Sequence, residues 1–297
     1  MKKVFITIII PVFNDNENLL NCLHAIEKQT VSKEDYEVIV IDNGGAQDPF
    51  SVAKKFENVR VVKEIKPGSY AARNRGINEA RGEMLAFTDA DAIPDVRWIE
   101  KGVDIFIGTP NCGFVAGRID VFAKKLNQPN PVERYEILVS HNQKNYVALQ
   151  QFGATANLFT SKTIIRKVGN FDGNLKSGGD LEWGQRVASY GFKVVYADDV
   201  IVRHPARNTL KALFQRNIRI AGGRIDHRRQ YQMPLISTRH LINMILPPFK
   251  DIIKNIFMRN SAGRFHQKSA LLGVILFVHY VTTFETLRVL LGRKSER

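Results

Sequence analysis

The chain has 297 residues, of which 44% are hydrophobic and 24% are charged, and its formal net charge is +14. This composition is ordinary for a globular protein and excludes disordered, collagen-like and low-complexity chains. The mean hydropathy of −0.18 excludes a polytopic membrane protein. Two cysteines, Cys22 and Cys112, are too few for a disulfide framework and form no CxxC metal pattern, so we expect reduced thiols in the cytosol.

The first residues, MKKVFITIIIPVF, have the lysines and the apolar stretch of a signal peptide. The apolar stretch stops at Pro11 and runs into the polar sequence FNDNEN, with no small-residue cleavage site. We therefore interpret residues 4–13 as a buried first strand.

Strand and helix patterns alternate over the first hundred residues. Strands are predicted at 4–13, 36–43, 59–62 and 82–91, and helices at 16–30, 48–56 and 69–80. The strand at 36–43 is apolar throughout its middle, as expected of a strand that is covered on both faces. This alternation predicts βαβ crossovers and a mostly parallel α/β sheet.

The second part of the chain is less regular. We expect a helix from Pro94 to about residue 108, a strand at 112–120 and a helix at 132–146. Residues 152–161 form a strand or a close-packed loop, 181–191 a helix and 192–204 the last strand. Beyond residue 204 the pattern changes to helices that contain many arginines.

The charge is unevenly distributed. Residues 1–202 contain 25 Lys and Arg and 25 Asp and Glu, whereas residues 203–297 contain 18 Lys and Arg against 4 Asp and Glu. The whole excess therefore lies in the last third, which predicts that this region faces an anionic partner.

Two acidic motifs follow predicted strands. Asp42, with Asn43 and two glycines after it, ends the second strand, where open α/β sheets bind ligands. It either accepts hydrogen bonds from a base or a ribose, or belongs to a simple turn. Asp89 and Asp91 end the fourth strand and suit a hard divalent cation, although such a pair also occurs in a helix-capping turn.

Arg73 and Asn74 project from the first turns of the helix predicted at 69–80. An arginine at this place pairs with a phosphate or stacks on a base. The alternative, a solvated helix face, fits Arg75 and Arg81 better than it fits Arg73.

Two further residues are candidates for the chemistry. Asp180 follows Gly178 and Gly179 at a helix start, where an acid is normally a cap but also suits a general base. His204 ends the last strand beside the basic region, and a single histidine is more often structural than a ligand.

Taken in order, these motifs resemble one family. IIIPVFN, IDNGGAQD, YAARNRGINEARGEMLAFTDAD, GGDLEWGQR and VRHP follow one another as in glycosyltransferase family 2 enzymes of GT-A fold, over roughly residues 4–225. The resemblance implies a Rossmann-like, mostly parallel sheet flanked by helices. No QxxRW motif follows, and Gln215-Arg216-Asn217 is only a weak echo of one, which argues against a processive polymer synthase.

The resemblance also implies residue roles for the donor, a nucleotide-diphosphate sugar. Pro11 would line the nucleotide pocket, and Asp42 would hold the base or the ribose. Arg73 and Asn74 would lie against the nucleotide, and Asp89 would also contact the donor through its metal.

The same resemblance implies a metal site and a base. Asp89 and Asp91 match the DxD motif, which holds Mn²⁺ or Mg²⁺ on the donor diphosphate, and His204 matches a histidine that completes the metal site in some relatives. Asp180 matches the catalytic base of an inverting enzyme, although Gly179 stands where the usual "ED" motif has a glutamate.

The predicted domains follow from these patterns. Residues 1–225 would form the catalytic domain, with a nucleotide-sugar half to about residue 120 and an acceptor half after it. Residues 226–297 would form a basic amphipathic helical region, with 16 residues free of formal charge at 269–284. Since a spanning helix needs about 20 apolar residues, we expect an interfacial or re-entrant helix here rather than one that spans the membrane.

The predicted function is transfer of a sugar to a cell-surface glycan or lipid-linked acceptor in polysaccharide biosynthesis. The predicted place is the cytoplasmic face of the cell membrane, with peripheral or monotopic attachment to an anionic surface. A nucleotidyltransferase, a non-enzymatic protein that binds anionic surfaces and a helical cap on the catalytic domain remain alternatives. We expect no nucleic-acid partner, because the basic third lacks interleaved aromatics and a recognition motif.

Overall fold

The structure is a computed structural model that describes residues 5–125, 128–234, 244, 247 and 265–295. The chain forms two compact units. Unit 1 takes its described residues from Met1–Asp120, His141–Asn174 and Gly179–His204, and unit 2 from Val121–Ser140, Leu175–Gly178 and Pro205–Arg297. The predicted division at residue 225 stays a prediction.

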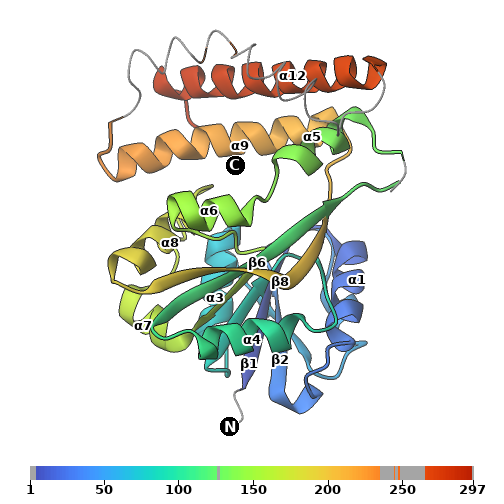
Figure 1. The fold of residues 1–297 in the computed structure, drawn as a ribbon, viewed down its shortest axis with the longest axis vertical. Helices are drawn as coiled ribbons and strands as arrows, with labels where there is room; N and C mark the ends of the chain where they lie inside the picture. Colours follow the sequence, from blue (N-terminus) through green and yellow to red (C-terminus); the bar gives the residue numbers. More distant parts are fainter. Residues whose placement is uncertain (1–4, 126–127, 235–243, 245–246, 248–264, 296–297) are drawn as a thin grey trace. The chain divides into compact units, whose positions relative to one another are not determined.

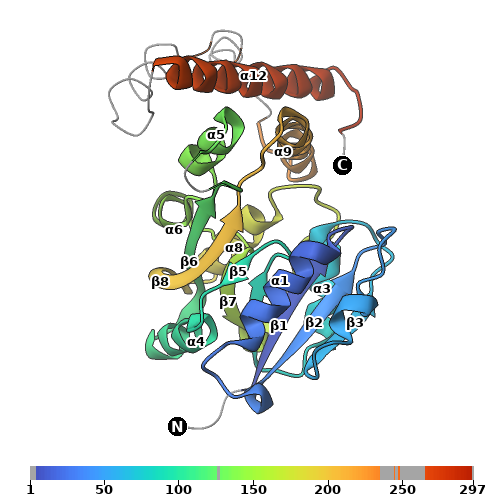
Figure 2. The same ribbon diagram turned by 90° about the vertical axis from the view of Figure 1, so that its right-hand side faces the viewer.

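Unit 1 is built on a sheet, of which Figure 1 labels β1, β2, β6 and β8. The described strands follow the order β3-β2-β1-β4-β7-β6-β8-β5. Its first half is parallel: β1 (Ile6–Val12) pairs with β2 (Tyr36–Asp42) and β4 (Met84–Thr88), and β2 pairs with β3 (Val59–Lys63). Figure 2 shows β1, β2 and β3 next to one another, with α1 (Asn16–Glu27) in front. The carboxyl ends of these strands consequently meet at one edge.

The second half of the sheet is antiparallel. β7 (Asn157–Ser161) pairs with β4 on one side and with β6 (Cys112–Phe122) on the other. β8 (Lys193–Pro205) follows β6, and the two-residue β5 (Ile93–Pro94) pairs with it at the edge. The pairing of Ile93 with Arg203 brings the end of β8 beside the segment that follows β4.

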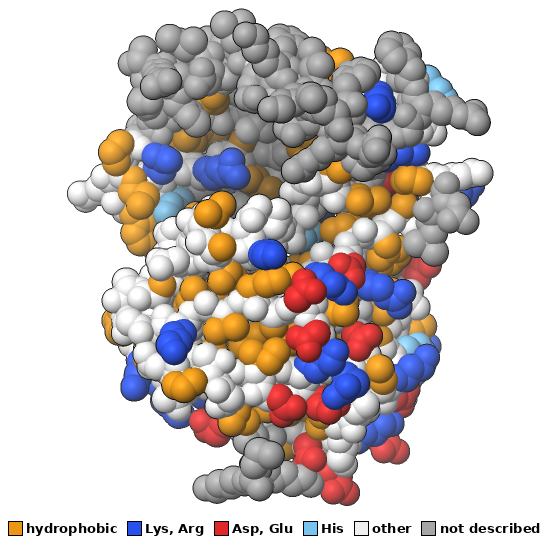
Figure 3. Space-filling model, in the orientation of Figure 1, with side chains coloured by type: hydrophobic (Ala, Val, Ile, Leu, Met, Phe, Trp, Pro, Cys, Tyr) orange, Lys and Arg blue, Asp and Glu red, His pale blue; other side chains and the backbone are white. Residues whose placement is uncertain are grey.

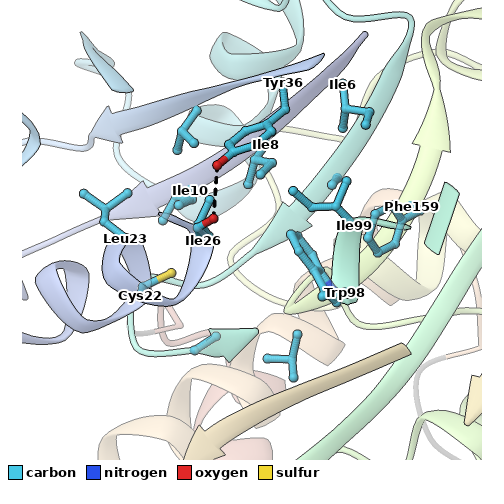
Figure 4. Packing of buried hydrophobic residues seen from close by; sticks show 14 of the residues in the cluster. Ile6, Ile8, Ile10, Cys22, Leu23, Ile26, Tyr36, Trp98, Ile99 and Phe159 are labelled. Carbon is cyan, nitrogen blue, oxygen red and sulfur yellow. Dashed lines mark hydrogen bonds between the residues drawn. The ribbon is translucent and has the colours of Figure 1, made fainter. Parts of the chain in front are cut away.

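One face of the sheet is covered by α1, over the parallel half, and by α4 (Trp98–Gly108), which packs against Phe159 of β7, and Figure 4 shows residues of this core. Ile8 of β1 lies in one cluster with Leu23 and Ile26 of α1 and with Trp98 of α4, and all four are buried. The Tyr36 hydroxyl donates a hydrogen bond of 3.1 Å to the Ile26 carbonyl, which satisfies a polar group inside this core.

The opposite face packs against α3 (Ser69–Glu79). A Cβ on Gly76 would lie only 2.4 Å from Cγ2 of Ile9 in β1, so glycine is the residue that lets this helix approach the sheet. Short helices complete the unit: η1 (Lys33–Asp35), α2 (Phe50–Ala53), α6 (Gln143–Gln150), α7 (Lys162–Val168) and α8 (Gly179–Ser189).

The described part of unit 2 is helical, with α5 (Pro131–Val139), α9 (Leu210–Gln230) and α12 (Phe265–Leu290). Val132, Leu213, Val274 and Val278 form its apolar cluster. Residues 266–290 are long and apolar enough to cross a membrane, by length and composition alone. Of the predicted basic amphipathic region 226–297, residues 235–243, 245–246, 248–264 and 296–297 lie outside the described residues.

The predicted α/β fold class and the C-terminal helix are confirmed, but the sheet is mixed rather than mostly parallel, because β7 pairs antiparallel with both β4 and β6, and β5 pairs antiparallel with β8. Acidic side chains on the sheet unit lie among basic ones in the lower part of Figure 3, as the charge balance of residues 1–202 leads one to expect. One predicted element is wrong in detail: the helix expected at 132–146 is two helices, α5 and α6, separated at His141, whose φ is +56°. Asn142 begins the second helix, because its side chain accepts a hydrogen bond from the Asn145 amide.

Sequence reasoning also missed α7, although the sequence contains a signal for the start of this helix and one for its end. Ser161 accepts a hydrogen bond from the Ile164 amide at the start of the helix, and Gly169 follows its last residue with φ +93°. The seven-residue length of α7 explains the omission, because two turns carry too few residues for a clear helical period.

Candidate functional site

The site lies at the carboxyl edge of the parallel strands in unit 1. Pro11 is near the end of β1, and the neighbouring Val12 is in register with Asp42, which ends β2. Asp89 comes directly after β4, the other neighbour of β1. Three residues predicted from separate stretches of sequence therefore converge because the strands run parallel.

Asp89 and Asp91 meet His204 at this edge. One ligand atom from each residue lies within 4.8 Å of the others, and Nε2 of His204 is 3.1 Å from Oδ1 of Asp91. The His204 side chain is buried, whereas both carboxylates are about one-third exposed. Two carboxylates and an imidazole with an open side suit Mn²⁺ or Mg²⁺, which fill their other positions with phosphate oxygens and water.

The charge balance around these acids supports a cation. Asp15, at the start of α1, shares a cavity with Asp89 and Asp91, and the pKa of its carboxyl is raised first by burial and then by the charge of Asp91. Carboxylates gathered this closely repel one another unless a positive group lies between them. The donor set and its mutual repulsion therefore both fit a divalent metal.

Arg73 is buried on α3, with only 4% of its surface exposed. Its Nη2 donates to Oδ1 of Asp89 across 2.6 Å, while its Nε finds no hydrogen-bond partner among the described residues. A buried N–H without a partner destabilises the protein by about 1–3 kcal/mol, so such a group is well suited to an anionic ligand.

Asp180 lies in the first turn of α8, where its Oδ1 accepts a hydrogen bond of 3.0 Å from the Thr155 hydroxyl. Burial raises the pKa of this carboxyl, the Arg73 guanidinium and the Thr155 hydrogen bond lower it, and Asp89 raises it further. Asp180 is therefore close enough to Arg73 and Asp89 to feel both charges. A raised pKa makes a carboxylate a stronger base at neutral pH.

The structure gives a reason for the glycine at position 179. A Cβ there would lie 2.8 Å from the ring of Tyr70, on α3, so a larger residue would displace the ring. The departure from the expected "ED" pattern is thus a packing adjustment, and it leaves Asp180 at the helix start.

Asp42 and Asn74 have structural partners. Oδ1 of Asp42 accepts a hydrogen bond of 3.0 Å from the Gly44 amide. This bond forms the turn that the sequence analysis gave as the alternative to a contact with a base or a ribose. Asn74 donates to the Phe171 carbonyl at 2.7 Å and accepts from the Phe171 amide at 3.1 Å. Their predicted contacts with the nucleotide stay predictions.

A cavity of about 210 Å³ opens between these strand ends. Its lining includes the predicted Pro11, Asp89 and Asp91, and also Phe13, at the end of the predicted first strand, and Asn43, which follows Asp42. Phe13 is 63% exposed although it is a large apolar side chain, and a ring in that position offers a face on which a base can stack. Its place directly after Pro11 and Val12 was the available signal.

Comparisons with known proteins give the family and the fold. Residues 7–169, more than half of the chain, match the family model described as glycosyl transferase family 2. Glycosyltransferase AglE of Haloferax volcanii is 34% identical over 247 residues, which cover 82% of this chain and 79% of AglE.

A more distant relative comes from Methanococcus voltae. It is named dolichyl N-acetyl-alpha-D-glucosaminyl phosphate 3-beta-D-2,3-diacetamido-2,3-dideoxy-beta-D-glucuronosyltransferase. It is 23% identical over 227 residues, which cover 72% of this chain and 71% of the relative.

Among solved structures, the mannosyltransferase PcManGT from Pyrobaculum calidifontis, in complex with GDP-Man and Mn²⁺, is similar with a TM-score of 0.65. The match covers 99% of this chain and 89% of PcManGT at 16% identity. At that identity the likeness shows a shared fold.

Proposed function

Because the chain belongs to glycosyl transferase family 2 and is a glycosyltransferase, we propose that it is a metal-dependent, inverting enzyme. In this proposal the donor is a nucleotide-diphosphate sugar and the acceptor is a hydroxyl of a glycan or a lipid-linked sugar. The observation that carries the proposal is the cluster of Asp89, Asp91 and His204 at the strand edge, with Asp180 and Arg73 near it. Family membership sets aside the nucleotidyltransferase alternative.

In the proposed reaction Asp89, Asp91 and His204 hold the metal. A divalent cation at this place supplies charge neutralisation for the leaving diphosphate as a Lewis acid. Arg73 lies beside this site, where its Nη2 donates to Asp89 and its buried Nε has no hydrogen-bond partner among the described residues. The buried guanidinium adds a fixed positive charge that needs no rearrangement during the reaction.

Asp180 is the proposed general base. Its carboxylate accepts the proton of the acceptor hydroxyl while the acceptor oxygen forms a bond to the anomeric carbon. The bond from that carbon to the diphosphate breaks in line, the diphosphate leaves with the electron pair, and the configuration inverts. Thr155 donates to Oδ1 of Asp180 and so orients the other carboxylate oxygen for the proton.

We expect a nucleotide-sugar donor to stabilise the protein against thermal unfolding when Mn²⁺ is present. A ligand at a hundred times its Kd stabilises the folded state by about 2.7 kcal/mol, which corresponds to several degrees in Tm for a chain of this size. The measurement is a thermal-shift screen of UDP-, GDP- and dTDP-sugars with Mn²⁺, repeated with EDTA. Nucleoside monophosphates are the controls, and a screen in which no donor raises Tm would count against the proposal.

The proposed acceptor and location rest on one relative's name and on the surface of α12. The name of the relative from Methanococcus voltae includes a dolichyl-linked sugar, and α12 presents apolar side chains to solvent, with Tyr280 51% and Phe284 66% exposed. We propose a lipid-linked or cell-surface acceptor at the cytoplasmic face of the membrane. In this proposal α12 lies in the interface, and the basic residues of 203–297 face anionic lipid.

We expect the protein to sediment with anionic phosphatidylglycerol vesicles at low salt and to be released progressively as salt rises, because charge attraction is screened. Phe284→Glu should weaken binding, since it places a carboxylate on the apolar face of α12. Leu149→Glu is the matched control, because Leu149 is 76% exposed on α6 of unit 1. A protein that stays in the supernatant at low salt would disprove membrane attachment.

A further inference from the structure

His141 packs against His204, a proposed metal ligand. The two ring centroids are 4.8 Å apart and the ring planes are inclined at 35°. His204 in turn directs Nε2 towards Asp91, at 3.1 Å. Because the His204 side chain is almost fully buried, the faces of its ring are covered by neighbours, and His141 is one of them.

The backbone of His141 adopts an uncommon conformation. Its φ is +56°, in the left-handed region that residues with a Cβ seldom occupy. The sequence predicts a continuous helix here, and a helical backbone would place the residue differently. Local strain of this kind persists only where the surroundings fix it, and it is concentrated at functional sites.

Gln143, two residues after His141, is 2% exposed. Its side chain accepts from the Ala154 amide at 2.8 Å and donates to the carbonyls of Ala154 and Asn157, each at 3.2 Å. Asn142 caps the following helix. The chain after His141 is therefore held to the segment that leads into β7, which leaves the imidazole of His141 against His204.

The ligand atoms of Asp89, Asp91 and His204 lie within 4.8 Å of one another, and His141 is not a member of that group. We propose that His141 is a positioning residue that holds the His204 imidazole in the orientation in which Nε2 faces the metal. This inference rests on the proposed function of the Asp89, Asp91 and His204 cluster. Residues that orient metal ligands typically change metal affinity by about 10–100-fold when they are replaced.

The test uses Mn²⁺ alone, with free Mn²⁺ measured by electron paramagnetic resonance, on the full-length chain. We expect His141→Gly to weaken Mn²⁺ binding by about 10-fold or more with Tm retained, because glycine adopts a positive φ freely and only the ring is lost. His141→Asn, which also tolerates this backbone, should weaken binding equally. His141→Phe restores a ring without any ligand atom and should recover affinity in the folded fraction.

Gln151→Gly is the matched control, because Gln151 also has a positive φ, +55°, and lies in the same unit at the end of α6. We expect its Mn²⁺ affinity to equal that of the wild type. Wild-type affinity in His141→Gly would overturn the inference while leaving the metal site intact. If His141→Asn bound Mn²⁺ with wild-type affinity, the inference would be overturned as well. A polar contact, and not the packing of a ring, would then orient His204. A wild-type protein that binds no Mn²⁺ would remove the proposed metal site and this inference together.

Discussion

Replacing Asp180 with asparagine is expected to abolish sugar transfer while leaving donor and Mn²⁺ binding intact. The amide oxygen of the introduced asparagine accepts the same hydrogen bond from Thr155, but an amide takes no proton from the acceptor. Loss of a general base lowers the rate by about 10²–10⁴-fold. The measurement is kcat for transfer beside the Kd of the donor nucleotide, and normal turnover by D180N would assign the base elsewhere.

The same variant is expected to be at least as stable as the wild type at neutral pH. Burial raises the pKa of Asp180, so the folded state favours the neutral carboxyl more than the unfolded state does. That stabilisation is fully present below the unfolded pKa of about 3.8 and is lost as pH rises through the folded value. D180N should consequently have an equal or higher Tm at pH 7, with the difference shrinking towards acid pH.

Glu182→Gln, on the same helix, is a control for which the expected effects on Tm and on transfer are reversed. Glu182 forms a bidentate pair with Arg186, at 2.7 and 2.8 Å, and takes no part in the proposed reaction. We expect E182Q to lower Tm and to retain transfer, the opposite of the result for D180N. If both variants lost activity together with stability, the loss in D180N would be structural.

The pH profile of the wild type gives a further readout of Asp180. Transfer requires the ionised carboxylate, so the rate should rise with pH through a pKa above the ordinary value of 3.8. Arg73 lowers this pKa, and R73Q should move the acid limb of the profile to higher pH. An acid limb that is unchanged in R73Q would show that Asp180 does not set it.

Replacing Asp91 with asparagine is expected to lower Mn²⁺ affinity and to reduce transfer by roughly 10²–10³-fold, which corresponds to several kcal/mol of lost charge stabilisation. Asp89 shares its charge with the Arg73 guanidinium at 2.6 Å, whereas Asp91 faces the imidazole of His204. Asp91 is therefore the carboxylate with more charge to offer a cation. Asparagine keeps the size of the side chain and removes that charge.

Mn²⁺ binding by calorimetry and transfer after EDTA treatment are the two measurements for Asp91. Chelation of the metal should stop transfer by the wild type. Added Mn²⁺ should restore wild-type transfer at a lower concentration than D91N requires. Asp104→Asn is the matched control, because Asp104 is exposed on α4 in the same unit. Equal Mn²⁺ affinity in D91N and the wild type would contradict the assignment of Asp91 as a metal ligand.

The sequence was sufficient for the parallel half of the fold, because apolar and β-branched residues mark its strands and α1, between the first two, is amphipathic. It was also sufficient to select Asp89, Asp91 and His204, since a strand end is a position that the pattern defines. Asp180 and Arg73 were selected on similar grounds. How close these residues lie to one another depends on which distant segments pack together. The sequence pattern within one segment does not predict that packing.

Sequence reasoning missed Thr155 and His141 for the same physical reason. Thr155 matters through one hydrogen bond to Asp180, and His141 matters through one ring contact with His204. Neither belongs to a motif, and the break between α5 and α6 that places His141 depends on the burial of Gln143. Such contacts arise from tertiary packing, which overrides the local helical pattern at 132–146.

The strand order has a consequence for synthesis on the ribosome. The open edge of β4 is filled by β7, and the chain must lengthen from Thr88 to Asn157 before that partner exists. At about 5–20 residues per second this takes several seconds, during which a strand of buried apolar residues has unpaired backbone groups along one side. A fragment that ends near residue 120 would keep this edge exposed permanently. The nucleotide-sugar half is therefore expected to aggregate when it is expressed by itself, and chaperones that bind nascent chains should raise the yield of the whole chain.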